Sequence, residues 1–155
     1  MQAAGFDAIQ AVRGCVRIGE DRLDPFDTPI PDPDLILDVE VLATLASIMP
    51  HERLLTLASS YLNGLLARAG RIAALSASGE LKLLAREAHD LKSTSGSFGA
   101  RRLQYLGENL ETACRDQDHA TAGSLAATIA AVVPETVTAV LRCHPDIPLD
   151  AGAPR

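Results

Sequence analysis

The feature that most constrains the fold is a helical spacing of apolar residues that begins at Asp34, continues to about Leu141, and is divided by prolines and glycines into five segments. In the segment around residues 81–98, apolar positions recur at alternating intervals of three and four and fall within an arc of about 100°. No stretch alternates with a period of two, and β-branched residues are sparse. The pattern therefore predicts an all-α fold.

Capping residues, prolines and glycines predict where each helix begins and ends. The first helix is capped by Asp34 and ended by Pro50, and the third carries His89 and ends near Gly99. The second, fourth and fifth run over residues 51–75, 100–115 and 118–141, with a turn at 76–79. Short connections favour antiparallel neighbours, so we expect an antiparallel up-down four-helix bundle with one additional N-terminal helix across an end. Pro134 lies inside the fifth segment and is expected to kink or divide it.

The chain divides into a flank, a core and a tail. Residues 1–33 are expected to form an N-terminal extension and proline-rich linker, in which residues 4–18 fit a short helix or an extended arm equally well. Residues 34–143 form the predicted bundle, and residues 144–155 form a C-terminal tail. A length of 155 residues is enough for one domain with a core.

Charge and composition exclude several classes of protein. A net charge of -6 and a pI near 5.1 argue against a nucleic-acid-binding protein, which needs a basic surface. The three cysteines are far apart and form no C-x-x-C pair, which argues against a disulfide framework or a zinc site. No secretory leader is recognised and no apolar run approaches the roughly 18 residues of a membrane span, so a cytoplasmic location without membrane contact is expected.

His89 is the residue best placed for chemistry. It lies roughly 130° from the centre of the apolar stripe of its helix, so its imidazole is expected to point at water. Exposed imidazoles are partly neutral near neutral pH and can attack phosphorus through one ring nitrogen. The residues that share its face are small or cationic: Lys82, Ala85, Arg86, Lys92, Ser93 and Gly96.

Two kinds of neighbour on this face suggest a role. Lys92 and Arg86, one turn away on either side, are predicted to stabilise a phosphoryl group held on the ring. A mid-helix glycine costs about 1 kcal/mol relative to Ala, and steric clearance for a partner protein explains Gly96. The alternative is that Gly96 begins the helix end that Gly99 completes and that the cations are ordinary solvated charges. The predicted partner-access surface consists of Ser93, Gly96, Ala85 and Lys82.

The segment from His89 onward resembles the signature of the histidine-containing phosphotransfer (HPt) domain, broadly H-x-L-K-G-S-S-x-x-[LF]-G-A followed by a leucine-rich helix with L-E. The resemblance extends from about Asp38 to Leu141. Ser93 stands where the family usually has glycine, and its hydroxyl narrows the approach to the imidazole while offering a hydrogen bond. The matching residues are His89, Leu91, Lys92, Thr94, Ser95, Phe98, Gly99, Ala100, Leu103, Leu110, Glu111 and Ala113.

The resemblance implies a monomeric four-helix bundle that accepts a phosphoryl group on His89 from an aspartyl phosphate and passes it to another receiver domain, with Lys92 steadying the phosphate. The implied partners are the receiver domains of a hybrid histidine kinase and of a response regulator. Mg²⁺ is expected on the receiver, so no cofactor or metal site is expected in this chain, and no ATP-dependent kinase activity of its own. Docking is expected around His89 and on the second helix, including Tyr61.

Two other functions remain open. His89 and Asp90 also resemble the H-box of the dimerisation domain of histidine kinases, although Thr94 stands where a proline is common there and no glycine-rich ATP loop is present. This interpretation requires a dimer. The second alternative is a helical adaptor that is never phosphorylated, which would bind its partners normally with His89 replaced by Gln.

The remaining polar residues are expected to be unremarkable. Glu108 and Glu111 lie three positions apart and are expected on a solvated face. Arg101 and Arg102 are expected to decorate the start of the fourth helix. A metal-binding bundle is disfavoured because three histidines lack a partner at ligand spacing: His51, His119 and His144.

Overall fold

The computed structural model describes residues 34–150, which form five helices and no strand. The all-α prediction is therefore confirmed. The predicted extension and linker (1–33, with the undecided segment 4–18) and residues 151–155 lie outside the described residues. The helices are α2 (Val39–Ile48), α3 (His51–Ser78), α4 (Leu81–Ser97), α5 (Arg101–Arg115) and α6 (His119–Cys143).

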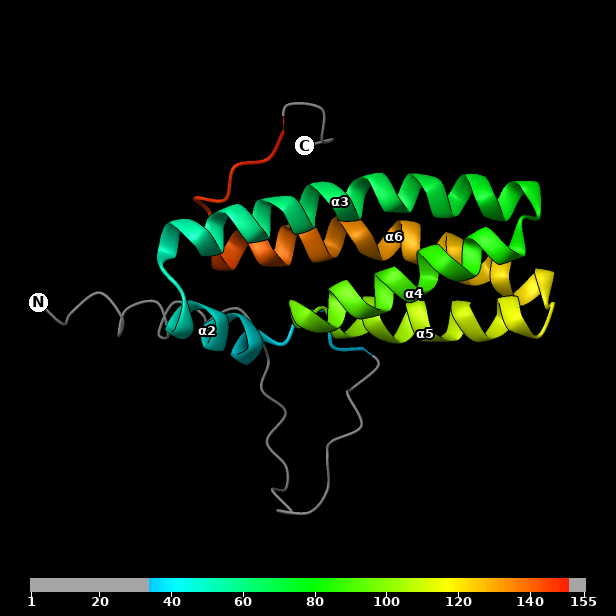
Figure 1. Ribbon diagram of the computed structural model, residues 1–155, viewed down its shortest axis with the longest axis horizontal. Coiled ribbons are helices and arrows are strands. Elements are labelled where there is room, and N and C mark those ends of the chain that lie inside the picture. The colour runs from blue at the N-terminus through cyan, green and yellow to red at the C-terminus, as the bar shows by residue number, and fades with distance from the viewer. Residues whose placement is uncertain (1–33, 151–155) are drawn as a thin grey trace, which may run out of the picture.

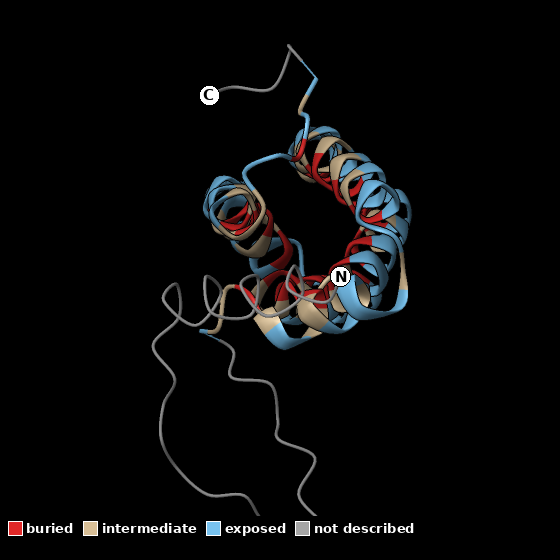
Figure 2. Cartoon of the chain, turned by 90° about the vertical axis from the view of Figure 1, so that its left-hand side faces the viewer, coloured by how far each residue is buried: buried red, intermediate tan, exposed pale blue. Residues whose placement is uncertain are grey.

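Helices α3 to α6 form the bundle, and α2 lies at one of its ends (Figure 1). Each of the four packs against the next along the chain, and α6 closes the ring by packing against α3. The short turns make successive helices antiparallel, as the sequence predicted. Seen along the bundle, the buried positions of all four helices face its centre (Figure 2).

The core consists of the apolar stripes that the helical spacing predicted. On α4 the buried positions are Leu81, Leu84, Ala88, Leu91 and Ser95. Full burial of one Leu or Ile side chain stabilises the fold by about 1.5–3 kcal/mol, so these stripes supply most of the driving force for the bundle. Leu57 is an exception among the leucines of α3, because it is 42% exposed.

The chain segment before α2 is anchored to the turn between α4 and α5. Asp38, not Asp34, caps α2, and Leu37 just before it is buried. The N–H of Asp38 donates to the carbonyl of Gly99 at 2.7 Å. Gly99 has φ +75°, and a Cβ at this position would lie 2.5 Å from the carbonyl oxygen of Asp38. Only glycine fits here, because a side chain would meet both the left-handed backbone and the approaching segment.

Two predicted helix boundaries differ in the structure. Helix α3 continues through the predicted turn and ends at Ser78, with Gly79 at φ +73° as its cap. Helix α6 runs unbroken through Pro134, so the residue does not divide this segment into two helices. Pro134 and Ala130, the residue whose carbonyl loses its helical donor, are both exposed, which makes the missing bond inexpensive.

Helix α6 also corrects the prediction that no segment is long and apolar enough to span a membrane. Its most apolar 18-residue window has a mean hydropathy of 1.7, which meets that test by length and composition. In the structure 39% of this window is buried, and α6 packs against α3 and α5. A core helix of a bundle accounts for the same composition.

Residues 144–150, the described part of the predicted tail, fold back against the bundle. Ile147 is 5% exposed and joins the core. The Ser59 hydroxyl on α3 donates to the carbonyl of Pro148, and the N–H of Asp150 donates to a side-chain oxygen on α3 at 3.3 Å. This part of the tail is thus a packed strap along α3.

Candidate functional site

His89 lies midway along α4 with its side chain 58% exposed, as the helical spacing predicted. Its neighbours Ala88 and Leu91 are fully buried, which fixes the rotation of the helix. The Nδ1 atom of the ring lies 3.3 Å from Oε1 of Glu111 on α5. The other ring nitrogen, Nε2, makes no hydrogen bond within residues 34–150.

Glu111 is the electrostatic centre of the site. Its carboxylate receives three donors: Nδ1 of His89, Nζ of Lys92 at 3.0 Å, and the guanidinium of Arg115. The Lys92 hydrogen bond, helped by those of Arg115 and His89, lowers the pKa of Glu111 from 4.5 to about 2. The side chain is only 11% exposed, so the prediction of a solvated Glu111 is wrong, whereas Glu108 is exposed.

The carboxylate determines which ring nitrogen is reactive. An ionised carboxylate accepts hydrogen bonds and cannot donate, so Nδ1 of His89 must carry the proton in this contact. The lone pair of the neutral ring then resides on Nε2, the nitrogen that faces away from Glu111. A separation of 3.3 Å is long for such a bond, and the contact strengthens when the ring becomes cationic.

Gly107 explains how Glu111 comes close enough to His89. A Cβ at this position on α5 would lie 2.9 Å from the backbone N of Lys92 and 3.0 Å from the carbonyl of Ala88. Any larger residue would therefore push α5 away from α4. Gly107 precedes Glu111 by one turn, so the close approach of the two backbones occurs directly beside the site.

An open pocket of about 360 Å³ lies beside the imidazole. Arg86 is exposed there and makes no hydrogen bond or ion pair within residues 34–150, so its charge is available to a ligand. Lys92 is 28% exposed beside the ring, and Lys82 is exposed but does not line the pocket. The pocket is lined by Ala85, Arg86, His89, Asp90 and Glu111.

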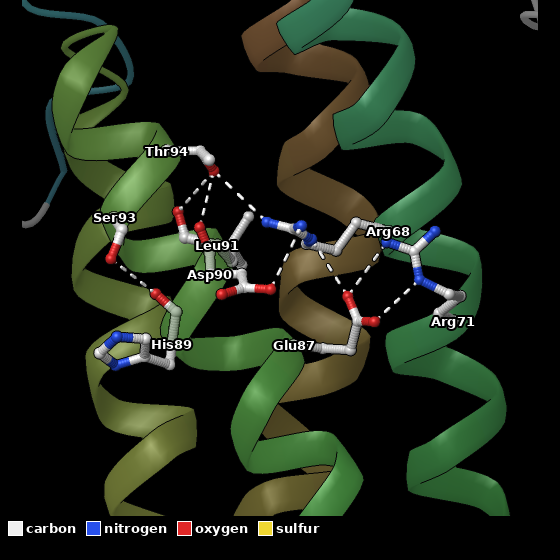
Figure 3. A network of polar contacts seen from close by, with 8 residues as sticks. All are labelled: Arg68, Arg71, Glu87, His89, Asp90, Leu91, Ser93 and Thr94. Carbon is white, nitrogen blue, oxygen red and sulfur yellow. Dashed lines mark hydrogen bonds and ion pairs between the residues drawn. The ribbon is translucent and has the colours of Figure 1, made fainter.

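A second charged network joins α3 to α4 on the other side of His89 (Figure 3). Glu87 pairs with Arg68 at 3.1 Å and with Arg71 at 2.9 Å, and the Arg71 hydrogen bond is the main cause of its lowered pKa. Arg68 also reaches Asp90 at 3.7 Å and the hydroxyl of Thr94 at 3.5 Å. Asp90 thus turns toward α3 rather than toward the imidazole.

The two small residues expected to give a partner access differ in their surroundings. Ser93 is exposed, and its hydroxyl donates to the backbone carbonyl of His89 at 3.1 Å. Gly96 is half-buried, and a Cβ there would lie 3.1 Å from Nε2 of Gln104. The space at Gly96 is therefore occupied by Gln104 and is not an empty approach for a partner.

Tyr61 belongs to the core and not to the docking surface, so that expectation is wrong. Its side chain is 8% exposed, and its ring stacks on Phe98 with centroids 4.3 Å apart. The hydroxyl lies 3.3 Å from Oγ of Ser95, which satisfies both buried polar groups. Burial raises the pKa of Tyr61 to about 12.

Arg101 is bound to neighbouring side chains and is not simply a surface charge at the start of α5. Its guanidinium binds Asp38 at 2.9 Å and also Gln104 at 3.1 Å. No group of three or more His, Cys, Asp or Glu residues within 34–150 is placed to hold a metal ion.

Sequence reasoning missed Gly107 and Gln104, and misjudged Glu111. One signal was available: a mid-helix glycine followed one turn later by a carboxylate on the same face of α5. Gln104 carries no comparable signal, since its position depends on a neighbouring helix.

Comparison with known proteins identifies the family. The sequence model of the Hpt domain matches residues 52–142, which is more than half of the 155 residues and includes both His89 and Glu111. No curated protein and no solved structure matches the chain. The match agrees with the signature around His89 and with the helical bundle. The chain therefore belongs to the Hpt domain family, whose members interact with receiver domains and serve histidine phosphotransfer in phosphorelays.

Proposed function

We propose that this chain is a phosphorelay intermediate: His89 accepts a phosphoryl group from the aspartyl phosphate of one receiver domain, that of a hybrid histidine kinase, and passes it to the receiver of a response regulator. The observation that carries the proposal is the contact between Nδ1 of His89 and Glu111, which directs the lone pair of the neutral ring to Nε2 on a side chain that is 58% exposed. A merely structural histidine would need neither feature.

The transfer is a substitution at phosphorus. The lone pair on Nε2 of His89 attacks the phosphoryl group while the bond from phosphorus to the aspartyl oxygen breaks, and the carboxylate leaves with that electron pair. The proton stays on Nδ1, and the positive charge that develops on the ring is stabilised by Glu111. In the second transfer a receiver carboxylate attacks, and the N–P electron pair returns to Nε2.

The surrounding cations match the charge of the transferred group. Lys92 has three donor hydrogens, so it can keep Glu111 and still contact a phosphoryl oxygen. Arg86 faces the same pocket without another partner in residues 34–150. We expect the receiver to bring Mg²⁺ in its own acidic pocket, where the ion neutralises the phosphoryl oxygens.

Two observations favour this function over the alternatives. A kinase-like dimerisation domain would use Asp90 beside the histidine, yet Asp90 turns to Arg68. That interpretation also needs a dimer, whereas these four helices close their own core within one chain. An adaptor that is never phosphorylated would not need a carboxylate such as Glu111 to orient the imidazole of His89.

The test is transfer from a phosphorylated receiver domain carrying radioactive phosphate. The wild-type chain should acquire acid-labile, base-stable label and then lose it to a second receiver. His89→Gln should acquire none, while His119→Gln, an exposed histidine on α6, should behave like wild type. The proposal is wrong if no competent receiver labels the wild type or if His89→Gln is labelled equally. Sedimentation analysis, expected to give a monomer, separates it from the kinase-like alternative.

A further inference from the structure

Gln104 occupies the surface that Gly96 leaves open. A Cβ at position 96 would lie 3.1 Å from Nε2 and 3.2 Å from Cδ of the Gln104 side chain. The glycine of α4 thus makes room for an amide group that comes from α5. Gln104 is half-buried, and Gly96, against which its amide lies, shares a helix face with Ser93 three positions before it.

The amide has one defined orientation. Nη1 of Arg101 donates to Oε1 of Gln104 at 3.1 Å. Because a guanidinium can only donate, the oxygen must face Arg101 and the NH₂ group must face away from it. The NH₂ group makes no hydrogen bond within residues 34–150, so its hydrogens remain available to a partner.

Arg101 is itself held by Asp38. Its Nε and Nη2 atoms donate to Oδ2 of Asp38 at 3.2 and 2.9 Å, and the two side chains are 26% and 27% exposed. Asp38 is the N-cap of α2. The orientation of Gln104 therefore depends on the docking of α2 at this end of the bundle.

The distance from His89 places Gln104 under a docked receiver. Gly96 follows His89 by two turns, or roughly 10 Å along the axis of α4 at 1.5 Å per residue. A protein interface of ordinary size buries about 800 Å² on each partner, equivalent to a disc of radius ~16 Å. A receiver centred over His89 covers the Gln104 amide.

We propose that Gln104 is a specificity-determining contact for receiver domains, in which its NH₂ group donates to an oxygen on the receiver and Arg101 acts as the residue that positions it. The inference rests on the proposed function of His89. An uncharged donor held in one orientation favours receivers that present an acceptor there. Receivers without that acceptor leave the amide unpaired in the interface and bind more weakly.

The test compares Gln104→Glu with wild type against a panel of phosphorylated receivers. The carboxylate keeps the acceptor for Arg101 but removes both donor hydrogens. The receiver concentration that gives half-maximal transfer to Gln104→Glu should rise about 5- to 100-fold for the preferred receiver and less for the others. The rate of phosphotransfer at saturating receiver should change less. Asn109→Asp makes the same chemical change on α5 and should leave the preference unaltered.

Two further measurements separate docking from chemistry. Phosphoramidate, a small phosphodonor that needs no docking, should label His89 in Gln104→Glu at the wild-type rate. Arg101→Lys retains a cation for Asp38 but releases Gln104. Like Gln104→Glu, this variant should lose more affinity for the preferred receiver than for the others. If Gln104→Glu kept the wild-type affinity for each receiver, this inference alone would be overturned. Absence of transfer to the wild type would overturn the proposed function and this inference together.

Discussion

The carboxylate of Glu111 lies 3.3 Å from Nδ1 of His89, across the interface between α5 and α4. The same carboxylate binds Lys92 at 3.0 Å, so the group that orients the imidazole also holds the cation beside it. The reactivity of His89 and the electrostatics of its pocket therefore depend on one side chain.

Glu111→Gln should change the tautomer of His89. Lys92 donates to Oε2 of Glu111, whereas His89 and Arg115 both contact Oε1. Because Lys92 can only donate, the amide oxygen should take the Oε2 position and the NH₂ group should face Nδ1, while the exposed Arg115 turns away. Nδ1 must then accept, and the proton moves to Nε2. We expect imidazole ¹⁵N spectra to report this exchange and phosphotransfer to slow by roughly tenfold or more. Unchanged spectra and rates would contradict the assigned role of Glu111.

Lys92→Ala should still be labelled on His89 but more slowly or with a less stable phosphate. The variant loses a cation next to the transferred group, and we expect roughly tenfold or greater slowing in rapid-quench measurements. Lys82→Ala is the matched control for labelling by phosphoramidate, which needs no docking, because Lys82 is exposed on the same helix but does not line the pocket. Transfer kinetics equal to wild type in Lys92→Ala would show that this cation has no role.

Acid should destabilise the protein partly through Glu111. The pKa of Glu111 is about 2 in the folded state against an ordinary 4.5, so its stabilising contribution is full above pH 4.5 and disappears as pH falls toward 2. Urea unfolding at a series of pH values should show a steeper loss of stability for wild type than for Glu111→Gln across that interval. Parallel curves for the two proteins would contradict the assigned carboxylate network.

Gly107→Ala should lower stability by about 1–3 kcal/mol and slow phosphotransfer, because the added methyl forces α5 away from α4. Gly64→Ala on α3 is the control. A Cβ there meets no atom within 4 Å, so this change should raise stability by up to about 1 kcal/mol. Equal effects of the two substitutions in urea unfolding would show that the close approach at Gly107 is unimportant.

The fold could be predicted from the sequence because its determinants are local. The apolar stripe around Leu84, Ala88 and Leu91 sets both the helix and the side that is buried, and the same rotation exposes His89. Helix α6 shows the limit of local rules. Pro134 alone suggests an interruption, but the helix continues because the residue and the carbonyl that loses its donor lie on the exposed side.

The candidate site was predicted only where it lies on one helix. Glu111 and Gln104 acquire their roles through contacts between α4 and α5, whose register no single segment encodes. Tyr61 was misplaced for the same reason, since its ring stacks on Phe98, which follows the end of α4. Residue spacing within a helix says which side chains share a face, but not which residue of a neighbouring helix meets them.

The position of the phosphoryl group after transfer from a receiver domain tests the role of His89 most directly. NMR correlation of ³¹P with imidazole ¹⁵N should show one phosphoryl group, on Nε2 of His89, acid-labile and base-stable. The signal should persist in a variant with the other three histidines replaced by Gln and vanish in His89→Gln. Phosphate on Nδ1, on another histidine, or on no histidine of the wild type would contradict the account.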